Sequence, residues 1–208
     1  MNAPGMTPRW PKGPFPERYR FPAVEARLAH GWSTEREEAY RSLVLGLDPV
    51  GPEDPWVRLV RVPDPSRRAE RFRALRARAK ELELVAFAWI APARARRDGL
   101  DAQDVLGVVP TSDPVDAVSA TGVAGPVHGI GMPAIVRFLV TLRSFGAFEI
   151  LAMGEDCLEL AFEAKNDEAL ARVAERVLRI CPPLARRESA EALAVRVRET
   201  SLLRMDWA

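Results

Sequence analysis

The stretch FEILAMGEDCLELAFE, residues 148–163, carries the clearest structural pattern in the chain. Two apolar runs, 148–153 and 157–163, flank the turn-forming residues Gly154-Glu155-Asp156. In the second run the large apolar residues Leu158, Leu160 and Phe162 stand at every other position, and Glu159 and Glu163 fall on the opposite face. This alternation predicts a β-hairpin with one buried face and one face in water.

Helical patterns surround the hairpin on both sides. A proline in the first turn favours a helix over 133–145 before it. After it, Asn166 is a typical N-cap for a helix over 167–180, and a second helix follows over 189–200. A final strand is predicted over 201–207. The C-terminal part therefore reads αββααβ.

The N-terminal part has a different order. After a helix over 34–46, the pattern predicts a strand over 56–62, a helix over 67–82 capped by Ser66, and a buried strand over 84–90. This order is βαβ-like.

Composition shifts divide the chain into four parts. Residues 1–22 form a proline-rich arm, 23–91 an α/β part, 92–103 a linker and 104–208 the C-terminal module. We expect an α+β fold, with the N-terminal βαβ-like part packed with the C-terminal αββααβ module around a mixed or antiparallel sheet. The pattern leaves open whether the two parts share one sheet.

Several landmarks of the C-terminal module resemble a known bacterial family. They are the step His128-Gly129-Ile130-Gly131, the hairpin from Gly154 to Leu160, the helix end Cys181-Pro182-Pro183 and the tail Met205-Asp206-Trp207. Their order is similar to that of the family catalogued as domain of unknown function 4253 (DUF4253), over roughly 104–208. Gly131 and Pro183 stand where that family has acidic residues. The resemblance implies the fold, and it implies that a polar site built from those acids is largely lost here.

Charge and composition exclude several classes of function. The chain has 208 residues, 48% of them apolar, with 30 basic and 29 acidic residues and a net charge of +1. A neutral chain has no overall field for nucleic acid or an anionic membrane. No apolar run approaches the roughly 20 residues that a membrane helix needs. Two cysteines and an N-terminus without a signal-peptide pattern predict a cytoplasmic protein.

The sharpest local feature is the predicted helix over 67–80, in which Glu70 is the only acidic residue. Its arginines are Arg67, Arg68, Arg71, Arg73, Arg76 and Arg78. One interpretation is an ordinary solvated face; the other is a docking surface for a protein with an acidic surface. The one aromatic residue among these arginines, Phe72, belongs to the apolar face of the predicted helix, so no aromatic residue interleaves with them on the basic face, which argues against nucleic acid.

A second, weaker candidate is a ligand pocket between the 122–131 loop and the 181–187 turn. Its polar groups are His128, Cys181, Arg186 and Asp206. Cys181 stands at the C-terminal end of a predicted helix, where the dipole disfavours a thiolate. We therefore assign no catalytic residue. With two histidines and two cysteines, none at ligand spacing, we expect no metal site and no cofactor.

These observations favour a non-catalytic protein-binding module that uses the arginine face or a sheet edge of the C-terminal module. A bacterial immunity-type protein, which neutralises a toxin, has this character. Two alternatives stay open. One is a small-molecule-binding or degenerate enzyme domain around His128 and Cys181. The other is a structural subunit whose proline-rich arm, 1–22, holds copies of the chain in a homo-oligomer.

Overall fold

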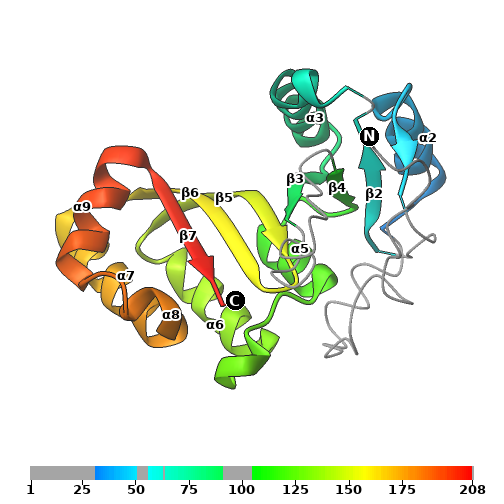
Figure 1. Ribbon diagram of the computed structural model, residues 1–208. Helices are drawn as coiled ribbons and strands as arrows, with labels where there is room; N and C mark the ends of the chain where they lie inside the picture. Colours follow the sequence, from blue (N-terminus) through cyan, green and yellow to red (C-terminus); the bar gives the residue numbers. More distant parts are fainter. Residues whose placement is uncertain (1–30, 51–55, 63, 91–104, 208) are drawn as a thin grey trace, which may run out of the picture.

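All strands of the described residues form a single mixed sheet. The computed structural model describes residues 31–50, 56–62, 64–90 and 105–207, so the predicted arm and linker lie outside the described residues. The strands are β1 (Asp48–Pro49), β2 (Arg58–Arg61), β3 (Val85–Ile90), β4 (Val105–Val109), β5 (Gly146–Gly154), β6 (Cys157–Ala164) and β7 (Leu202–Asp206). Their spatial order is β1-β2-β4-β3-β5-β6-β7 (Figure 1). The α+β fold is confirmed.

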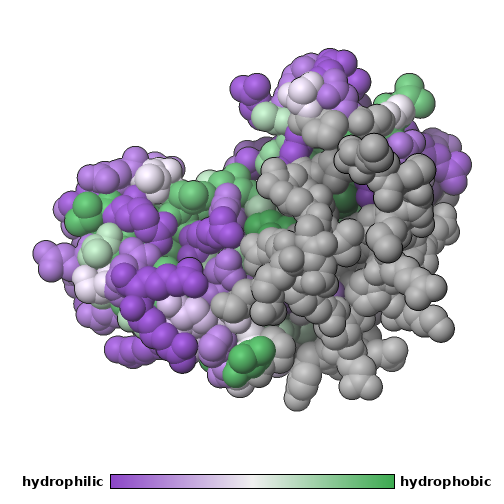
Figure 2. Space-filling view, viewed as in Figure 1, coloured by the Kyte–Doolittle hydropathy of each residue, from purple (hydrophilic) through white to green (hydrophobic). Residues whose placement is uncertain are grey.

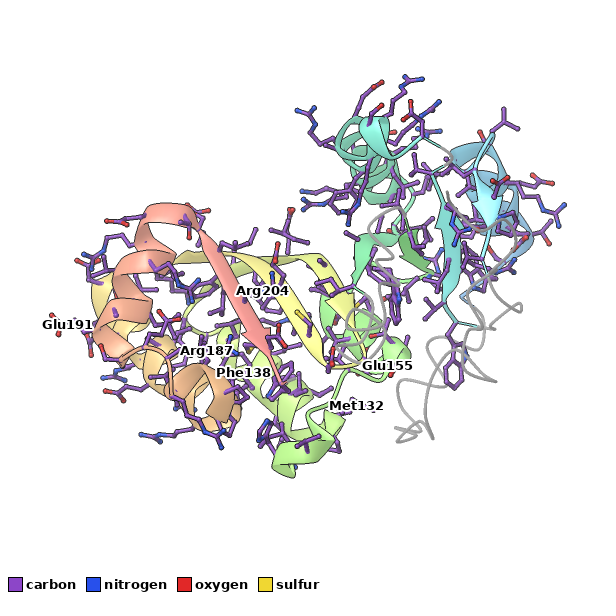
Figure 3. The ribbon with its side chains drawn as sticks, in the orientation of Figure 1. Met132, Phe138, Glu155, Arg187, Glu191 and Arg204 are labelled. Atoms are coloured by element: carbon purple, nitrogen blue, oxygen red, sulfur yellow. The ribbon has the colours of Figure 1, made fainter. Side chains whose placement is uncertain are left out.

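The helices divide between the two faces of this sheet. They are α2 (Thr34–Leu43), α3 (Arg68–Glu81), α5 (Pro114–Thr121), α6 (Met132–Leu142), α7 (Asp167–Ile180), α8 (Pro182–Ala185) and α9 (Ala190–Thr200), with short 3-10 turns at Pro65–Arg67 and Pro126–His128. Helices α5 to α9 pack on one face in the larger core, to which Phe138 of α6 belongs (Figure 3). Helices α2 and α3 pack on the other face, over β2, β3 and β4.

The two predicted parts share one sheet, because β3 pairs with β5. This parallel pairing covers only Ala88–Ile90 against Ala152–Gly154. The βαβ-like unit is also more complex than its sequence indicates. Strands β2 and β3 are both antiparallel to β4, which lies between them, so they run parallel to each other without touching. Sequence order alone does not reveal an inserted strand.

The predicted hairpin is confirmed. Strands β5 and β6 are antiparallel, and the register pairs Phe148 with Phe162 and Ile150 with Leu160. The register shifts at Leu151, as in a β-bulge. Leu158, Leu160 and Phe162 are buried, while Glu163 is exposed. One face of the hairpin thus belongs to the core, as the alternation predicts.

Helix starts show where sequence reasoning succeeds and fails. Asn166 caps α7, since its side chain accepts a hydrogen bond from the backbone of Ala169 at 2.8 Å. Ser66 does not cap α3: the N-cap is Arg67, without a side-chain bond. The Ser66 hydroxyl and backbone N–H instead donate to Asp64, at 2.6 and 2.9 Å.

One glycine fixes the entry to the hairpin. The helix predicted over 133–145 ends at Leu142, and Gly146 already begins β5. A Cβ at Gly146 would lie 2.1 Å from the carbonyl oxygen of Glu163. Glycine is therefore needed for close strand pairing at this point.

The face of β5, β6 and β7 that lies on the same side as α3 carries no helix from the described residues. The register aligns Ala152, Glu159 and Arg204 across this face, and beside them Glu149, Ala161 and Leu202. The last three and Arg204 are all partly or fully exposed. Figure 2 shows the surface hollowed beside α3, with apolar residues over the strands at the bottom of the hollow.

Candidate functional site

Helix α3 presents the predicted arginines on its outer side. Only Leu75 and Ala79 of this helix are buried, and they face the core formed with β2, β3 and β4. The arginines are accordingly exposed or, for Arg68 and Arg76, half-exposed. Attachment along a narrow stripe leaves most of the helix circumference in solvent.

Ion pairs neutralise half of the six predicted arginines. Arg67 pairs with Glu70 at 2.9 Å, and Arg78 pairs with Glu81. A hydrogen bond from Arg67 and the charge of Arg67 lower the pKa of Glu70. The charges of Arg71 and Arg73 lower this pKa further.

The remaining arginines, Arg68, Arg71 and Arg73, lie in the N-terminal half of the helix. Arg71 and Arg73 are both exposed, and neither forms an ion pair within the described residues. Arg73 Nε donates to the carbonyl of Ala69 at 3.3 Å, a bond that leaves its charge uncompensated. This part of α3 is therefore a basic surface.

Arg76 and Lys80 lie on the side of α3 that faces β5. Both bind the carboxylate of Glu149: Arg76 Nη2 contacts Oε2, and Lys80 Nζ lies 3.3 Å from Oε1. The Arg76 guanidinium also lies over the ring of Phe72, at 5.6 Å from its centroid. These contacts connect the N-terminal helix to the C-terminal hairpin.

A half-open cleft of about 170 Å³ lies beside these charges, where β3 and β5 diverge. Its polar lining comes from Arg76, Lys80, Glu149 and the exposed Ser112. Its apolar lining comes from Leu84, Val85, Ala86, Pro114, Phe148 and Ile150. The cleft has an apolar floor and a charged rim. It therefore suits a ligand that carries both a charged group and an apolar group better than it suits a free ion.

Cys181, which was predicted to line a ligand pocket, belongs to the packed core. Cys181 is fully buried, and its thiol lies 3.3 Å from the backbone carbonyl of Asp206. Burial raises the pKa of Cys181, which opposes thiolate formation. The charge of Arg187 in this turn (Figure 3), rather than that of Arg186, lowers this pKa, but by less than burial raises it.

Trp207 occupies the space between the two segments that were predicted to enclose a ligand. Its indole Nε1 donates to the carbonyl of Ile180 at 2.6 Å, and its ring packs directly on Gly125. Its backbone N–H donates to Asp156 at 2.9 Å. This 1% exposed side chain thus joins the end of α7, the loop before α6 and the hairpin turn.

The other predicted pocket residues do not line the cleft beside Arg76 and Lys80. His128 is half-exposed in the Pro126–His128 turn, and Arg186 is exposed after α8. The Asp206 carboxylate accepts a hydrogen bond from Arg204 at 3.3 Å. A ligand role for these residues remains a prediction without geometric support.

The edge of the sheet at β7 is closed at both ends. Antiparallel alternation directs the backbone groups of Leu202, Arg204 and Asp206 away from β6. The Asp206 carbonyl accepts from the Cys181 thiol, and the Leu202 N–H donates to Thr200 Oγ1 at 3.2 Å. Capping of this kind protects an edge from pairing with another strand. It makes the edge a poorer docking site than α3.

The sequence pattern gave no role to Glu149, and Trp207 entered only as part of the tail landmark Met205-Asp206-Trp207. Glu149 is the one acidic residue within the apolar run 148–153, which is a weak signal of an outward position. Its partners lie 69 and 73 residues away, and no local pattern indicates such a contact.

The described residues contain neither a cluster of metal ligands nor a membrane-spanning helix. Among them, no three His, Cys, Asp or Glu side chains are placed to hold a metal ion. None of their helices has the length and apolar character needed to cross a membrane.

Comparison with known proteins gives one match. The model of the family described as "Domain of unknown function (DUF4253)" matches residues 105–208. This agrees with the resemblance of the C-terminal landmarks. No curated protein and no solved structure matches the chain.

Proposed function

The chain belongs to the DUF4253 family, and from the geometry of α3 we propose that it is a protein-binding module whose partner has an acidic surface. The observation that carries this proposal is the exposed pair Arg71 and Arg73, neither of which forms an ion pair within the described residues. Complementary charge steers a partner to such a surface and selects against partners of the wrong sign.

The attachment of α3 supports this role. The buried residues Leu75 and Ala79 attach the helix to the sheet, so its outer face does not serve the core. The neutral net charge of the chain makes this basic surface local rather than general. A local basic surface favours a partner with a matching acidic patch over a polyanion. An immunity-type protein that binds and neutralises a bacterial toxin is the form of this function that we propose.

The first experiment identifies the partner and tests the arginines. The tagged protein is used for affinity capture from its native cell lysate, with low-salt and high-salt washes and mass spectrometry. The purified partner is then titrated by calorimetry against wild type and against Arg71→Glu/Arg73→Glu. We expect the double variant to bind at least about tenfold more weakly, as charge reversal in complementary interfaces costs several kcal/mol.

The matched control reverses two exposed arginines on another helix, Arg172→Glu/Arg179→Glu on α7. Each of these arginines pairs with an acid one turn away on its own helix, at 2.6 and 3.9 Å. The control should retain wild-type affinity. Equal affinity of wild type and the Arg71/Arg73 variant would exclude the arginine face as the binding surface.

A further inference from the structure

Arg76 and Lys80 bind one carboxylate from two positions. They are four residues apart, so their side chains leave α3 on the same face. Each contacts a different oxygen of Glu149. The pair is thus already arranged to bind a carboxylate group.

Glu149 holds this position weakly. Its side chain is 56% exposed, and that of Lys80 is 82% exposed. An exposed ion pair gains little, because water and salt screen the charges and ordering two long side chains costs entropy. A carboxylate from another molecule can therefore replace Glu149 at small cost.

The cleft shows what else such a ligand would carry. Directly beside the two cations lie the side chains of Val85, Phe148 and Ile150, which line a space of about 170 Å³. This volume admits an apolar side chain next to the carboxylate. The combination favours a protein segment with an acidic residue beside an apolar one.

We propose that Arg76 and Lys80 form a carboxylate-binding site, filled by Glu149 in the free protein and by an acidic side chain of the partner in the complex. An apolar neighbour of that side chain enters the cleft between β3 and β5. This inference rests on the proposed function: Arg71 and Arg73 attract the acidic partner, and the cleft receives one of its side chains. Glu149 acts as an internal competitor.

Removing the competitor Glu149 tests the proposal, because Glu149→Gln removes the carboxylate and leaves both cations. The probe is a capped Glu-Leu-Glu-Leu peptide, titrated at low salt and followed by NMR of the arginine and lysine side chains. We expect Glu149→Gln to bind this peptide about threefold more tightly than wild type, as for a site that its weak internal ligand fills about two-thirds of the time. The gain should vanish in Arg76→Gln/Glu149→Gln.

Glu163→Gln is the matched control. Glu163 is exposed on the neighbouring strand β6, so the substitution changes the net charge equally without freeing Arg76 or Lys80. Equal peptide affinity of the Glu149 and Glu163 variants would overturn the inference. Tighter binding of inorganic phosphate than of peptide to Glu149→Gln would overturn the assignment to a carboxylate. Neither result bears on the Arg71/Arg73 test with the purified partner, which judges the proposed function separately.

Discussion

Helices α3 and α7 have the same length, 14 residues, and both carry several arginines, yet they are attached to the sheet in different ways. Helix α7 buries five residues, and Asn166 caps its start. Helix α3 buries two and begins at Arg67 without a side-chain cap. Arginine content alone therefore does not mark a binding surface. What distinguishes α3 is positive charge that the structure does not use for its own packing.

The largest difference should appear when one apolar residue is removed from each helix. Leu170→Ala in α7 removes a side chain that is 4% exposed, and should cost about 2–5 kcal/mol of unfolding free energy. Phe72→Ala in α3 removes a larger but half-exposed side chain and should cost only about 1 kcal/mol. Urea denaturation measures both. A Phe72 variant as unstable as the Leu170 variant would show that α3 is anchored as firmly as α7.

The C-terminal end of α7 gives the next largest effect. Trp207→Phe keeps an aromatic ring but leaves the Ile180 carbonyl without its donor, at a cost of about 1–3 kcal/mol. Trp32→Phe is the control, since the buried indole nitrogen of Trp32 has no hydrogen-bond partner among the described residues. Its cost should be smaller. Similar melting temperatures for the two variants would mean that the indole bond does not hold the end of α7.

Substitutions at the starts of the two helices should change the unfolding free energy by an intermediate amount. Asn166→Ala removes the cap of α7 and should cost about 1 kcal/mol. Ser66→Ala removes an exposed hydroxyl that caps nothing and should change the unfolding free energy by less than about 0.5 kcal/mol. Chemical denaturation of the two single variants tests this contrast. An equal loss for both would restore Ser66 as a cap of α3.

Ionisation of Cys181, the residue that ends α7, should change the unfolding free energy by a smaller amount that depends on pH. The ordinary thiol pKa is 9.0, and burial raises that of Cys181 in the folded chain. Above the ordinary value the unfolded chain releases the thiol proton while the folded chain keeps it, so stability falls as pH rises. This contribution is complete below the ordinary value and is lost as pH rises toward the folded pKa.

The measurement compares unfolding free energies of wild type and Cys181→Ala from about pH 8 to about pH 10. The advantage of wild type should shrink over this range by less than about 1.4 kcal/mol per pH unit. Cys157 is present in both proteins, so its titration cancels. A constant difference would show that the Cys181 thiol is not protected from ionisation by the fold.

The same two helices show what the sequence can predict. The hairpin 148–163, helix α7 and its cap follow from local patterns, because side-chain alternation and capping act within a few residues. The path of β4 between β2 and β3 and the pairing of Glu149 with α3 are long-range, so no local pattern contains them. The arginines were visible in the sequence, but which of them are neutralised depends on contacts such as that between Arg76 and Glu149.

The smallest effect on stability should come from the residues that matter most for binding. Arg71→Glu/Arg73→Glu changes two exposed side chains that contact no acid within the described residues and contribute nothing to the core of α3. It removes repulsion between Arg71 and Arg68, three residues apart, and between Arg73 and Arg76, but it also replaces the attraction of both residues to Glu70 by repulsion. These small surface effects oppose each other, so the unfolding free energy should stay within about 0.5 kcal/mol of wild type. Thermal denaturation tests this, and a large loss would mean that these arginines stabilise the fold. Unchanged stability together with lost partner binding would separate the two roles, because only a surface dedicated to a partner can lose one without the other.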